Sequence, residues 1–229
     1  MYRRIICMMM MAIGVISAQA QEDWGNYRRF EKDNQVVKTL PQDQRKVVFM
    51  GNSITEGWIN QHPDFFKKNG YVNRGISGQT SYQMLLRFHE DVVNLHPKAV
   101  VINAGTNDIA QNNHFYVEDR TFENIVAMVE IAQANKIKVI LTTITPCDHY
   151  GWRPEITNVI EKIQHLNGRI CDYAKTHKCL FVDYFSAMAD ERGAMRKGLA
   201  ADGEGCHPLS EGYDVMEPLV TAAIQKAVK

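Results

Sequence analysis

Short apolar runs rich in β-branched residues alternate with longer stretches of helical periodicity along most of this chain. The apolar runs are Lys46–Met50, Tyr71–Asn73, Ala99–Asn103, Lys138–Thr143 and Leu180–Asp183. The amphipathic stretches are Ser81–Leu95, Thr121–Asn135, Glu155–Thr176 and Glu211–Val228. Strands that are apolar on both faces and alternate with helices indicate a parallel sheet covered by helices on both sides. We therefore expect an α/β fold, a flavodoxin-like three-layer α/β/α sandwich with a five-stranded parallel sheet.

Two polar residues are expected to cap helices. Thr80 precedes the first amphipathic stretch, and Gln83 stands three residues later, which is the pattern of a capping box. Ser210 precedes the last stretch and is a candidate N-cap for it.

The N-terminus has the pattern of a signal peptide. Arg3 and Arg4 precede the apolar run Ile5–Ile16, which falls short of the roughly 18 residues that suggest a membrane-spanning helix. Ala18-Gln19-Ala20 then resembles a cleavage site. We expect residues 1–20 to be removed and the protein to be exported, either periplasmic or extracellular, with no membrane contact after cleavage near Ala20. A membrane anchor formed by this run is the alternative, and no lipobox-like sequence precedes Cys7 to suggest a lipid anchor.

The remaining chain is of the length and composition of one globular domain. Hydrophobic residues make up 45% and charged residues 23% of the sequence. Without Arg3 and Arg4, 24 basic and 26 acidic side chains remain, so no nucleic-acid partner is indicated. Residues 21–45 are polar, with Trp24, Tyr27 and Phe30 at helical spacing, and are expected to pack on a domain formed by residues 46–229.

Glycine-containing polar loops follow the first three predicted strands, and a further one lies near the C-terminus. They are Gly51–Gly57, Asn73–Thr80, Asn103–Asp108 and Asp202–Pro208. Taken singly, such loops are more often turns or helix caps than catalytic elements. Functional residues of open α/β sheets lie beyond the carboxyl ends of the strands, which is where these loops fall.

Together, the loops contain the groups that acyl transfer requires. Ser53 can act as nucleophile and His207 as base, provided that an acid orients the imidazole. The backbone N–H groups of Ser53 and Gly78 and the side-chain amide of Asn107 can form an oxyanion hole.

At these positions the chain resembles the SGNH, or GDSL-like, hydrolase superfamily, in its exported bacterial form. Gly51-Asn52-Ser53-Ile54, Gly75-Ile76-Ser77-Gly78, Gly105-Thr106-Asn107-Asp108 and His207-Pro208 match its four blocks in order, from about Lys46 to the C-terminus. The resemblance implies the same three-layer fold, no metal or other cofactor, and esterase, lipase or deacetylase activity. Gly-x-Ser-x-Gly is absent, which separates the chain from the α/β-hydrolases.

The acid of the triad is left open by the sequence. The family usually places it three residues before the histidine, where this chain has Glu204. Asp202 stands five residues before His207 and forms an Asp-Gly pair like the family's own, which favours it slightly. A third reading is that neither acid reaches His207, in which case the Ser-His pair would work poorly.

Several other residues are weaker candidates. Trp58, Tyr150 and Trp152 could stack on a sugar ring, although ordinary packing is the commoner role for each. Arg74 could bind an acidic substrate, with a solvated arginine as the simpler reading. Cys147 and Cys206 could form a disulfide that pins the His207 loop, with two free thiols as the default.

Two classes of function are consistent with these residues. The first is an esterase acting on a small-molecule or carbohydrate ester, with short acyl groups such as acetyl favoured because no apolar lid is evident. An O-acetyltransferase is a variant on the same site. The second class is a catalytically impaired SGNH-like carbohydrate-binding protein, which the displaced acid favours. The oligomeric state is not indicated.

Overall fold

The computed structural model of this protein describes residues 23–201, 203 and 205–229. The predicted signal peptide over residues 1–20 lies outside the described residues. Both candidate acids, Asp202 and Glu204, also lie outside them. Within the described residues, no helix combines the length and the apolar character needed to cross a membrane.

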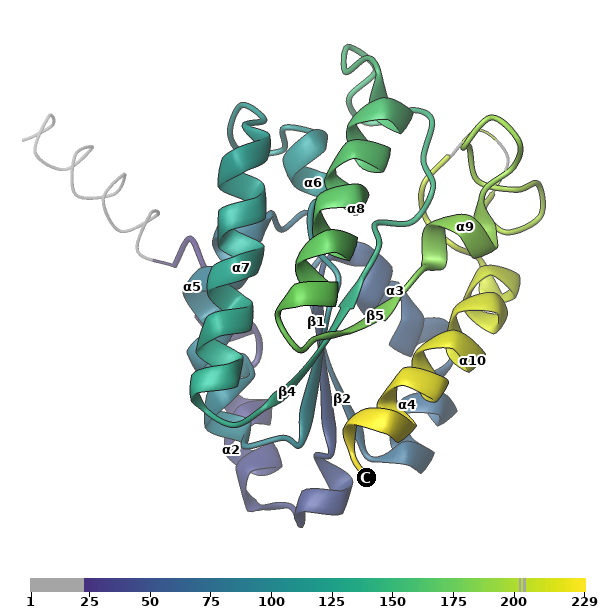
Figure 1. Cartoon of the computed structure of the whole chain (residues 1–229). Helices are drawn as coiled ribbons and strands as arrows, with labels where there is room; N and C mark the ends of the chain where they lie inside the picture. The colour runs from purple at the N-terminus through teal and green to yellow at the C-terminus, as the bar shows by residue number, and fades with distance from the viewer. Residues whose placement is uncertain (1–22, 202, 204) are drawn as a thin grey trace, which may run out of the picture.

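In the described part of the chain, one parallel sheet of five strands forms the centre of the molecule (Figure 1). Its spatial order is β2-β1-β3-β4-β5, which is the flavodoxin-like order. The fold predicted from the sequence is therefore confirmed. The strands are β1 (Val47–Gly51), β2 (Tyr71–Gly75), β3 (Ala99–Ile102), β4 (Lys138–Thr142) and β5 (Leu180–Val182).

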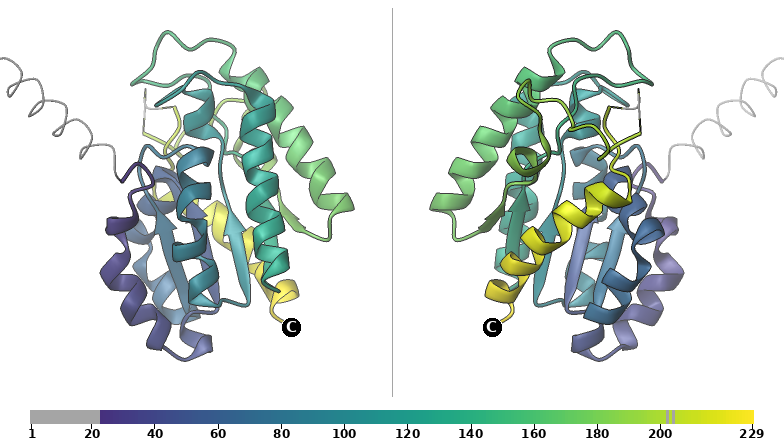
Figure 2. Two further views of the ribbon diagram at one scale, coloured as in Figure 1. Left: turned by 90° about the vertical axis from the view of Figure 1, so that its left-hand side faces the viewer. Right: turned by 90° about the vertical axis from the view of Figure 1, so that its right-hand side faces the viewer.

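Helices cover both faces of the sheet, and the two views of Figure 2 show the three layers. Buried side chains of α3, α4 and α10 pack on one face, and those of α5, α7 and α8 pack on the other. Short helices α6 and α9 lie in the connections. Their bounds are α3 (Ser53–Gln61), α4 (Pro63–Asn69), α5 (Ser81–Asp91), α6 (Thr106–Ile109), α7 (Glu118–Ala134), α8 (Val159–Thr176), α9 (Tyr184–Met188) and α10 (Ser210–Ala227).

The sheet separates two hydrophobic clusters because side chains alternate along each strand. In β1, Val47 and Phe49 belong to the cluster under α3, α4 and α10, whereas Val48 and Met50 belong to the cluster under α5, α7 and α8. All five residues of β1 are buried. This is the two-sided burial that its continuous apolar run predicts.

Helix boundaries differ from the sequence expectation at several points. The helices α3 and α4 were not expected. The helix α8 begins at Val159, because Asn158 has a left-handed backbone (φ 54°) that ends the preceding loop. The capping box at Thr80 is present, with the Thr80 N–H donating to Gln83 Oε1 at 3.2 Å. Ser210 is not the N-cap of α10; Leu209 holds that position.

The N-terminal segment packs against the domain through short helices. A 3₁₀ helix η1 (Tyr27–Arg29) leads into α2 (Glu31–Thr39), and η2 (Gln42–Gln44) precedes β1. Val37 of α2 is buried in the cluster under α5, α7 and α8. The Tyr27 hydroxyl donates to the Leu86 carbonyl of α5 at 2.7 Å.

The cysteines of the described residues, Cys147, Cys171, Cys179 and Cys206, form no disulfide. Cys147 and Cys206 are both fully buried, and the Cys147 thiol donates to the His149 carbonyl at 3.0 Å. The bridge considered between them is absent from the structure.

Candidate active site

Ser53 is the first residue of α3, and Asn52 alone separates it from the carboxyl end of β1. Asn52 caps this helix, since its Oδ1 accepts the Ile54 N–H at 3.0 Å. The start of α3 packs directly on the end of β2: a Cβ on Gly75 would lie 2.2 Å from the Glu56 nitrogen, so only glycine fits there. As a first-turn residue, Ser53 has a backbone N–H without a helical acceptor, at the positive end of the helix dipole.

His207 lies beside Ser53, although 154 positions separate them in the sequence. Its Nε2 is 2.8 Å from the Ser53 Oγ. A neutral imidazole that accepts the hydroxyl proton at Nε2 carries its own proton at Nδ1, which is the arrangement of a general base. The described residues therefore contain a Ser-His pair with the geometry needed to activate the hydroxyl.

Gly78 and Asn107 lie on the two loops that follow β2 and β3. Gly78 has a left-handed backbone (φ 78°), which glycine adopts at low cost. The buried Asn107 amide donates to the Gln79 carbonyl at 2.9 Å. An amide NH₂ group has two N–H donors, so the second N–H of Asn107 can donate to another acceptor. The Gln79–Asn107 bond thus ties two of the three candidate oxyanion donors together, since Gln79 directly follows Gly78.

Asp108 is a fully buried carboxylate that fixes the loop after β3. It accepts hydrogen bonds from the Ser81 N–H at 2.9 Å and the Ser81 hydroxyl at 2.5 Å. His114 Nε2 lies 3.7 Å from Asp108 Oδ1, and the nearby Asp108 carboxylate raises the His114 pKa. Asp108 thereby holds the Asn107 loop against the start of α5.

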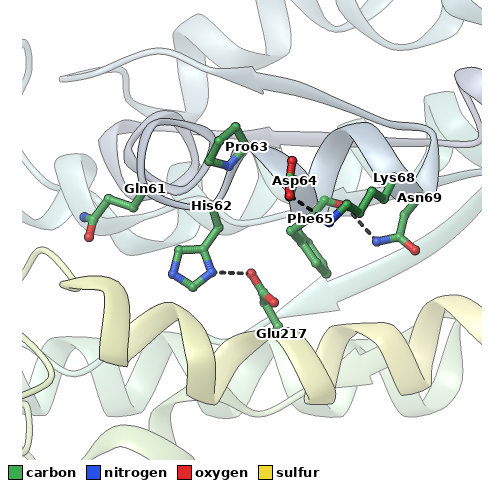
Figure 3. Close-up of a pocket in the computed structure, with 8 residues that line it drawn as sticks. All are labelled: Gln61, His62, Pro63, Asp64, Phe65, Lys68, Asn69 and Glu217. Carbon is green, nitrogen blue, oxygen red and sulfur yellow. Dashed lines mark hydrogen bonds and ion pairs between the residues drawn. The ribbon is translucent and has the colours of Figure 1, made fainter.

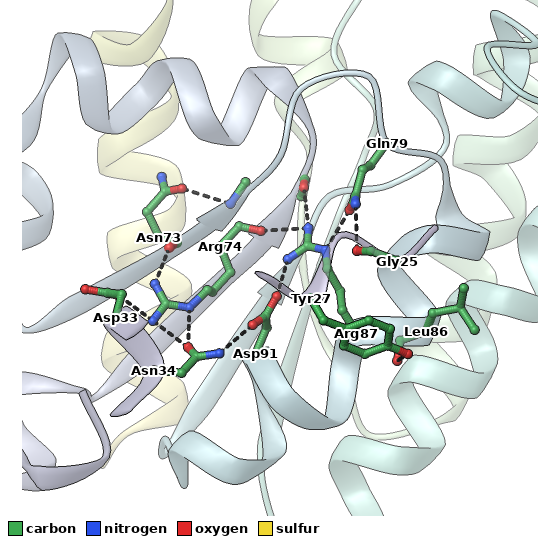
Figure 4. Close-up of polar contacts among 12 residues, drawn as sticks. Gly25, Tyr27, Asp33, Asn34, Asn73, Arg74, Gln79, Leu86, Arg87 and Asp91 are labelled. Atoms are coloured by element: carbon green, nitrogen blue, oxygen red, sulfur yellow. Dashed lines mark hydrogen bonds and ion pairs between the residues drawn. The ribbon is translucent and has the colours of Figure 1, made fainter. Parts of the chain in front are cut away.

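A network of buried polar side chains binds the ends of β1 and β2, where the active-site loops begin (Figure 4). Arg87 of α5 is fully buried and donates to the Gly51 carbonyl at 3.1 Å and the Arg74 carbonyl at 2.9 Å, at the ends of β1 and β2. Its remaining bonds go to Gln79 Oε1 at 2.6 Å and to Asp91 at 2.8 Å. Burial lowers the Arg87 pKa, and the Asp91 charge opposes that shift.

Arg74 is neither a solvated residue nor a substrate ligand in this structure, so both readings of it were wrong. It is buried and donates to Asn34 and to Asp33, the latter at 2.6 Å. Its guanidinium also lies 4.6 Å from the centre of the Phe30 ring. Burial lowers the Arg74 pKa, which Asp33 and Asp91 oppose. Arg74 therefore binds the N-terminal segment to the sheet.

Glu56 links the nucleophile helix to two other segments. It accepts the Ser77 N–H at 2.8 Å, next to Gly78, and Arg29 of η1 at 2.9 Å. Burial raises the Glu56 pKa, but hydrogen bonds from Ser77 and Arg29 outweigh it, so the pKa lies below its ordinary value. The resulting carboxylate couples α3, the Gly78 loop and the N-terminal segment.

The three aromatic candidates divide into two groups. Trp58 and Tyr150 are buried, and Trp58 stacks on Phe65 and Tyr213, so both are packing residues. Trp152 is 40% exposed, and its ring centre lies 5.5 Å from that of His207. Only Trp152 of the three stands beside the Ser-His pair with an accessible face.

A second Ser-His pair, Ser210 and His62, lies where the α3–α4 junction meets α10, and Glu217 extends it to a hydrogen-bonded Ser-His-Glu chain. His62 Nε2 is 2.8 Å from the Ser210 Oγ, and His62 Nδ1 is 2.6 Å from Glu217 Oε1. It borders a hollow of about 530 Å³ between α4 and α10 (Figure 3). The neighbouring Gln61 donates to the Pro208 carbonyl at 3.1 Å. These hydrogen bonds hold the segment that follows His207 against the C-terminal end of α3, the helix that begins with Ser53.

Gln79, Arg87, Glu56 and His62 were not singled out from the sequence, because their roles depend on partners far along the chain. Among the described residues, no group of three or more His, Cys, Asp or Glu side chains could hold a metal ion.

The chain matches the sequence profile of the GDSL-like lipase/acylhydrolase family over residues 49–215. It therefore belongs to that family, which confirms the resemblance seen in the four loops. The crystal structure of a GDSL-like lipase from Bacteroides thetaiotaomicron VPI-5482 is 53% identical to it, with a TM-score of 0.86. That alignment covers 90% of this chain and 100% of the other.

Two further proteins are more distant. The uncharacterized lipoprotein YqeF of Bacillus subtilis (strain 168) is 33% identical over 117 residues, which are 44% of this chain and 48% of YqeF. The match thus spans about half the length of that curated relative. The acetylxylan esterase Axe2 of Geobacillus stearothermophilus is 20% identical, with a TM-score of 0.62 over 78% of this chain and 93% of its own. At that identity the likeness concerns the fold.

Proposed function

We propose that this protein is an exported serine esterase that cleaves short-chain esters, acetyl esters of carbohydrates above all. The observation that carries the proposal is the 2.8 Å contact between Ser53 Oγ and His207 Nε2 at the N-terminus of α3. Membership of an acylhydrolase family supports the reaction class. The relationship to a lipoprotein supports export.

In the first half-reaction, Ser53 Oγ attacks the ester carbonyl while its proton moves to His207 Nε2. The carbonyl π electrons move to oxygen, and this oxyanion accepts bonds from the Ser53 and Gly78 N–H groups and the Asn107 amide. When the carbonyl re-forms, the C–O bond to the alcohol breaks, and the imidazolium gives its proton to the departing oxygen. The products are a free alcohol and an acyl group on Ser53.

In the second half-reaction, water replaces the alcohol. His207 removes a proton as the water oxygen bonds to the acyl carbon, and collapse of the intermediate breaks the bond to Ser53 Oγ. The imidazolium returns its proton to Ser53, and the carboxylic acid leaves. Asp202 or Glu204 would orient the His207 ring.

Axe2, which shares this fold, is named an acetylxylan esterase. That name is consistent with an acetyl ester of a carbohydrate as the proposed substrate. A hollow beside Gly78 is lined mostly by polar side chains and by two tryptophans, Trp24 and Trp152. Such a lining supports a carbohydrate ester as the substrate.

A fluorophosphonate probe tests the nucleophile directly. We expect the wild-type protein to gain the mass of one probe molecule less HF by intact mass spectrometry, because only an activated serine attacks the phosphorus and displaces fluoride. Ser53→Ala should gain none. Ser210→Ala is the matched control, since it removes the hydroxyl of the second Ser-His-Glu chain, and should react like wild type. Labelling that persists in Ser53→Ala and disappears in Ser210→Ala would reassign the nucleophile.

Asn107→Ala tests the oxyanion hole. Loss of one such donor typically raises the barrier by roughly 2.7–4 kcal/mol, so kcat on p-nitrophenyl acetate should fall about 10²- to 10³-fold. The KM should change little, because the donor acts mainly on the developing charge. A circular dichroism melt checks that the loop is intact. An Asn107→Ala enzyme with wild-type kcat would remove Asn107 from the oxyanion hole.

A further inference from the structure

A hollow of about 600 Å³ lies beside the Gly78 loop, on the side of the N-terminal segment. The loop residues Ile76, Ser77 and Gly78 line it directly, so a molecule bound there would approach the proposed oxyanion hole. Two of its other walls come from segments far apart in the sequence. Asp23, Trp24 and Asn26 line it from one segment, and Trp152 and Arg153 from the other.

Two tryptophans contribute accessible indole surface to this hollow. Trp24 is 47% exposed and Trp152 is 40% exposed. The side-chain amides of Gln83, Asn112 and Asn113 also line the hollow, and each uses one N–H in a bond within the protein, so a second N–H remains for a sugar oxygen. An aromatic face combined with amide groups suits a sugar ring, which has apolar C–H faces and hydroxyl edges. An acyl chain would need a predominantly apolar lining.

The charged groups of the hollow are already engaged by the protein. Asp23 accepts the N–H groups of Tyr27 at 2.6 Å and Arg28 at 3.2 Å. Arg153 donates to Glu155 at 2.6 Å and to the Gln111 carbonyl. The Arg153 charge is balanced by Glu155, and the Asp23 carboxylate would repel an anion, so a neutral sugar fits the lining better than an acidic one.

Both tryptophans are held in place by contacts that reach the active-site loops. The Trp152 indole donates to Asn112 Oδ1 at 2.9 Å, and the Asn112 amide donates to the Gly78 carbonyl at 3.2 Å. On the other wall, Gln83 donates to the Trp24 carbonyl at 2.9 Å. The buried Gln79 donates to the next carbonyl, that of Gly25, at 3.0 Å. The walls are therefore pre-organised relative to the Gly78 loop.

We infer that the N-terminal segment is part of the substrate site: Trp24 and Trp152 bracket a neutral pyranoside ring whose ester reaches Ser53. This inference rests on the proposed esterase function. It adds that the enzyme selects the alcohol part of its ester, which is a neutral sugar. Trp24 is the cleaner residue to test, since Trp152 also packs against His207.

The test compares two acetyl esters on Trp24→Ala. One is p-nitrophenyl acetate, and the other is the best substrate among mono-O-acetylated methyl pyranosides of xylose, glucose, mannose and N-acetylglucosamine. We expect the KM for the sugar acetate to rise about five- to tenfold with kcat nearly unchanged, the scale of one lost aromatic stacking contact. The kcat/KM for p-nitrophenyl acetate should stay within about twofold of wild type.

Trp24→Phe should retain most of the sugar affinity because it keeps an aromatic face. Phe115→Ala is the matched control, since Phe115 is 86% exposed and does not line the hollow. An unchanged KM in Trp24→Ala, or an equal loss on both esters, would overturn the inference. So would a wild-type enzyme that cleaves p-nitrophenyl acetate and no sugar acetate, although the esterase would stand. If wild type cleaves neither ester and resists the fluorophosphonate, the proposed function itself fails.

Discussion

Ser53→Ala is expected to lower kcat on p-nitrophenyl acetate by about 10⁵- to 10⁶-fold. Loss of the nucleophile in a serine hydrolase acts on this scale, and the residual rate comes from the oxyanion hole and substrate binding. The substitution removes the Oγ that lies 2.8 Å from His207 Nε2 and leaves the Asn52 cap of α3 in place. Release of p-nitrophenolate measures it, with Ser210→Ala expected at the wild-type rate. A loss smaller than tenfold would contradict the acyl-enzyme mechanism.

The same assay identifies the acid. An amide in place of the triad carboxylate favours the wrong imidazole tautomer, and this costs about 10⁴-fold in kcat. Asp202→Asn and Glu204→Gln each remove one candidate, so the more damaging variant marks the residue that orients His207. Equal and small effects would support the third reading, in which neither acid completes the triad.

Asp91→Ala is expected to lower the free energy of unfolding by about 3–5 kcal/mol. Its carboxylate receives Arg87 at 2.8 Å and Asn34 at 2.7 Å, and the Arg87 and Asp91 side chains are 0% and 1% exposed. The variant leaves the Arg87 charge buried without this counter-ion. For a chain of this size, the melting temperature should fall by about 6–20 °C.

Asp64→Ala provides a matched control for Asp91→Ala. Asp64 and Lys68 also form an i,i+4 acid–base pair, at 2.7 Å, but their side chains are 70% and 73% exposed. Removing an exposed pair should leave the unfolding curve unchanged. Thermal and urea unfolding followed by circular dichroism compare the two variants. Equal melting temperatures for both would show that the Arg87 network is not a source of stability.

The fold was predictable because its signals are local. Continuous apolar runs marked the strands, and the rule for open sheets placed Ser53, Gly78 and Asn107 along one edge. The sequence could not reveal Arg74 and Arg87 as buried residues. Composition favours solvated arginines. The partners that reveal their burial come from other elements: Asp33 and Asn34 for Arg74, and the carbonyls of Gly51 and Arg74 for Arg87.

Other differences concern side chains whose environment is set by distant segments. Ordinary packing was the favoured role for Trp58, and its position between Phe65 and Tyr213 confirms that role, but these partners were not evident from the sequence. Ser210 has the residue type of an N-cap, but its hydroxyl contacts His62 of the α3–α4 junction instead. Local sequence preference identified residue types that suit these positions in both cases. It could not show which distant side chains each of them contacts.

The attachment of the N-terminal segment has a consequence for how relatives of this protein can diverge or be engineered. The residues that hold it, Phe30, Asp33 and Asn34, follow Trp24 in the same N-terminal segment of the chain. A graft of this short stretch between homologues would carry its own anchoring groups with it, provided that the recipient keeps the arginine pair. Substrate range could then be exchanged as a cassette, with the catalytic loops left untouched.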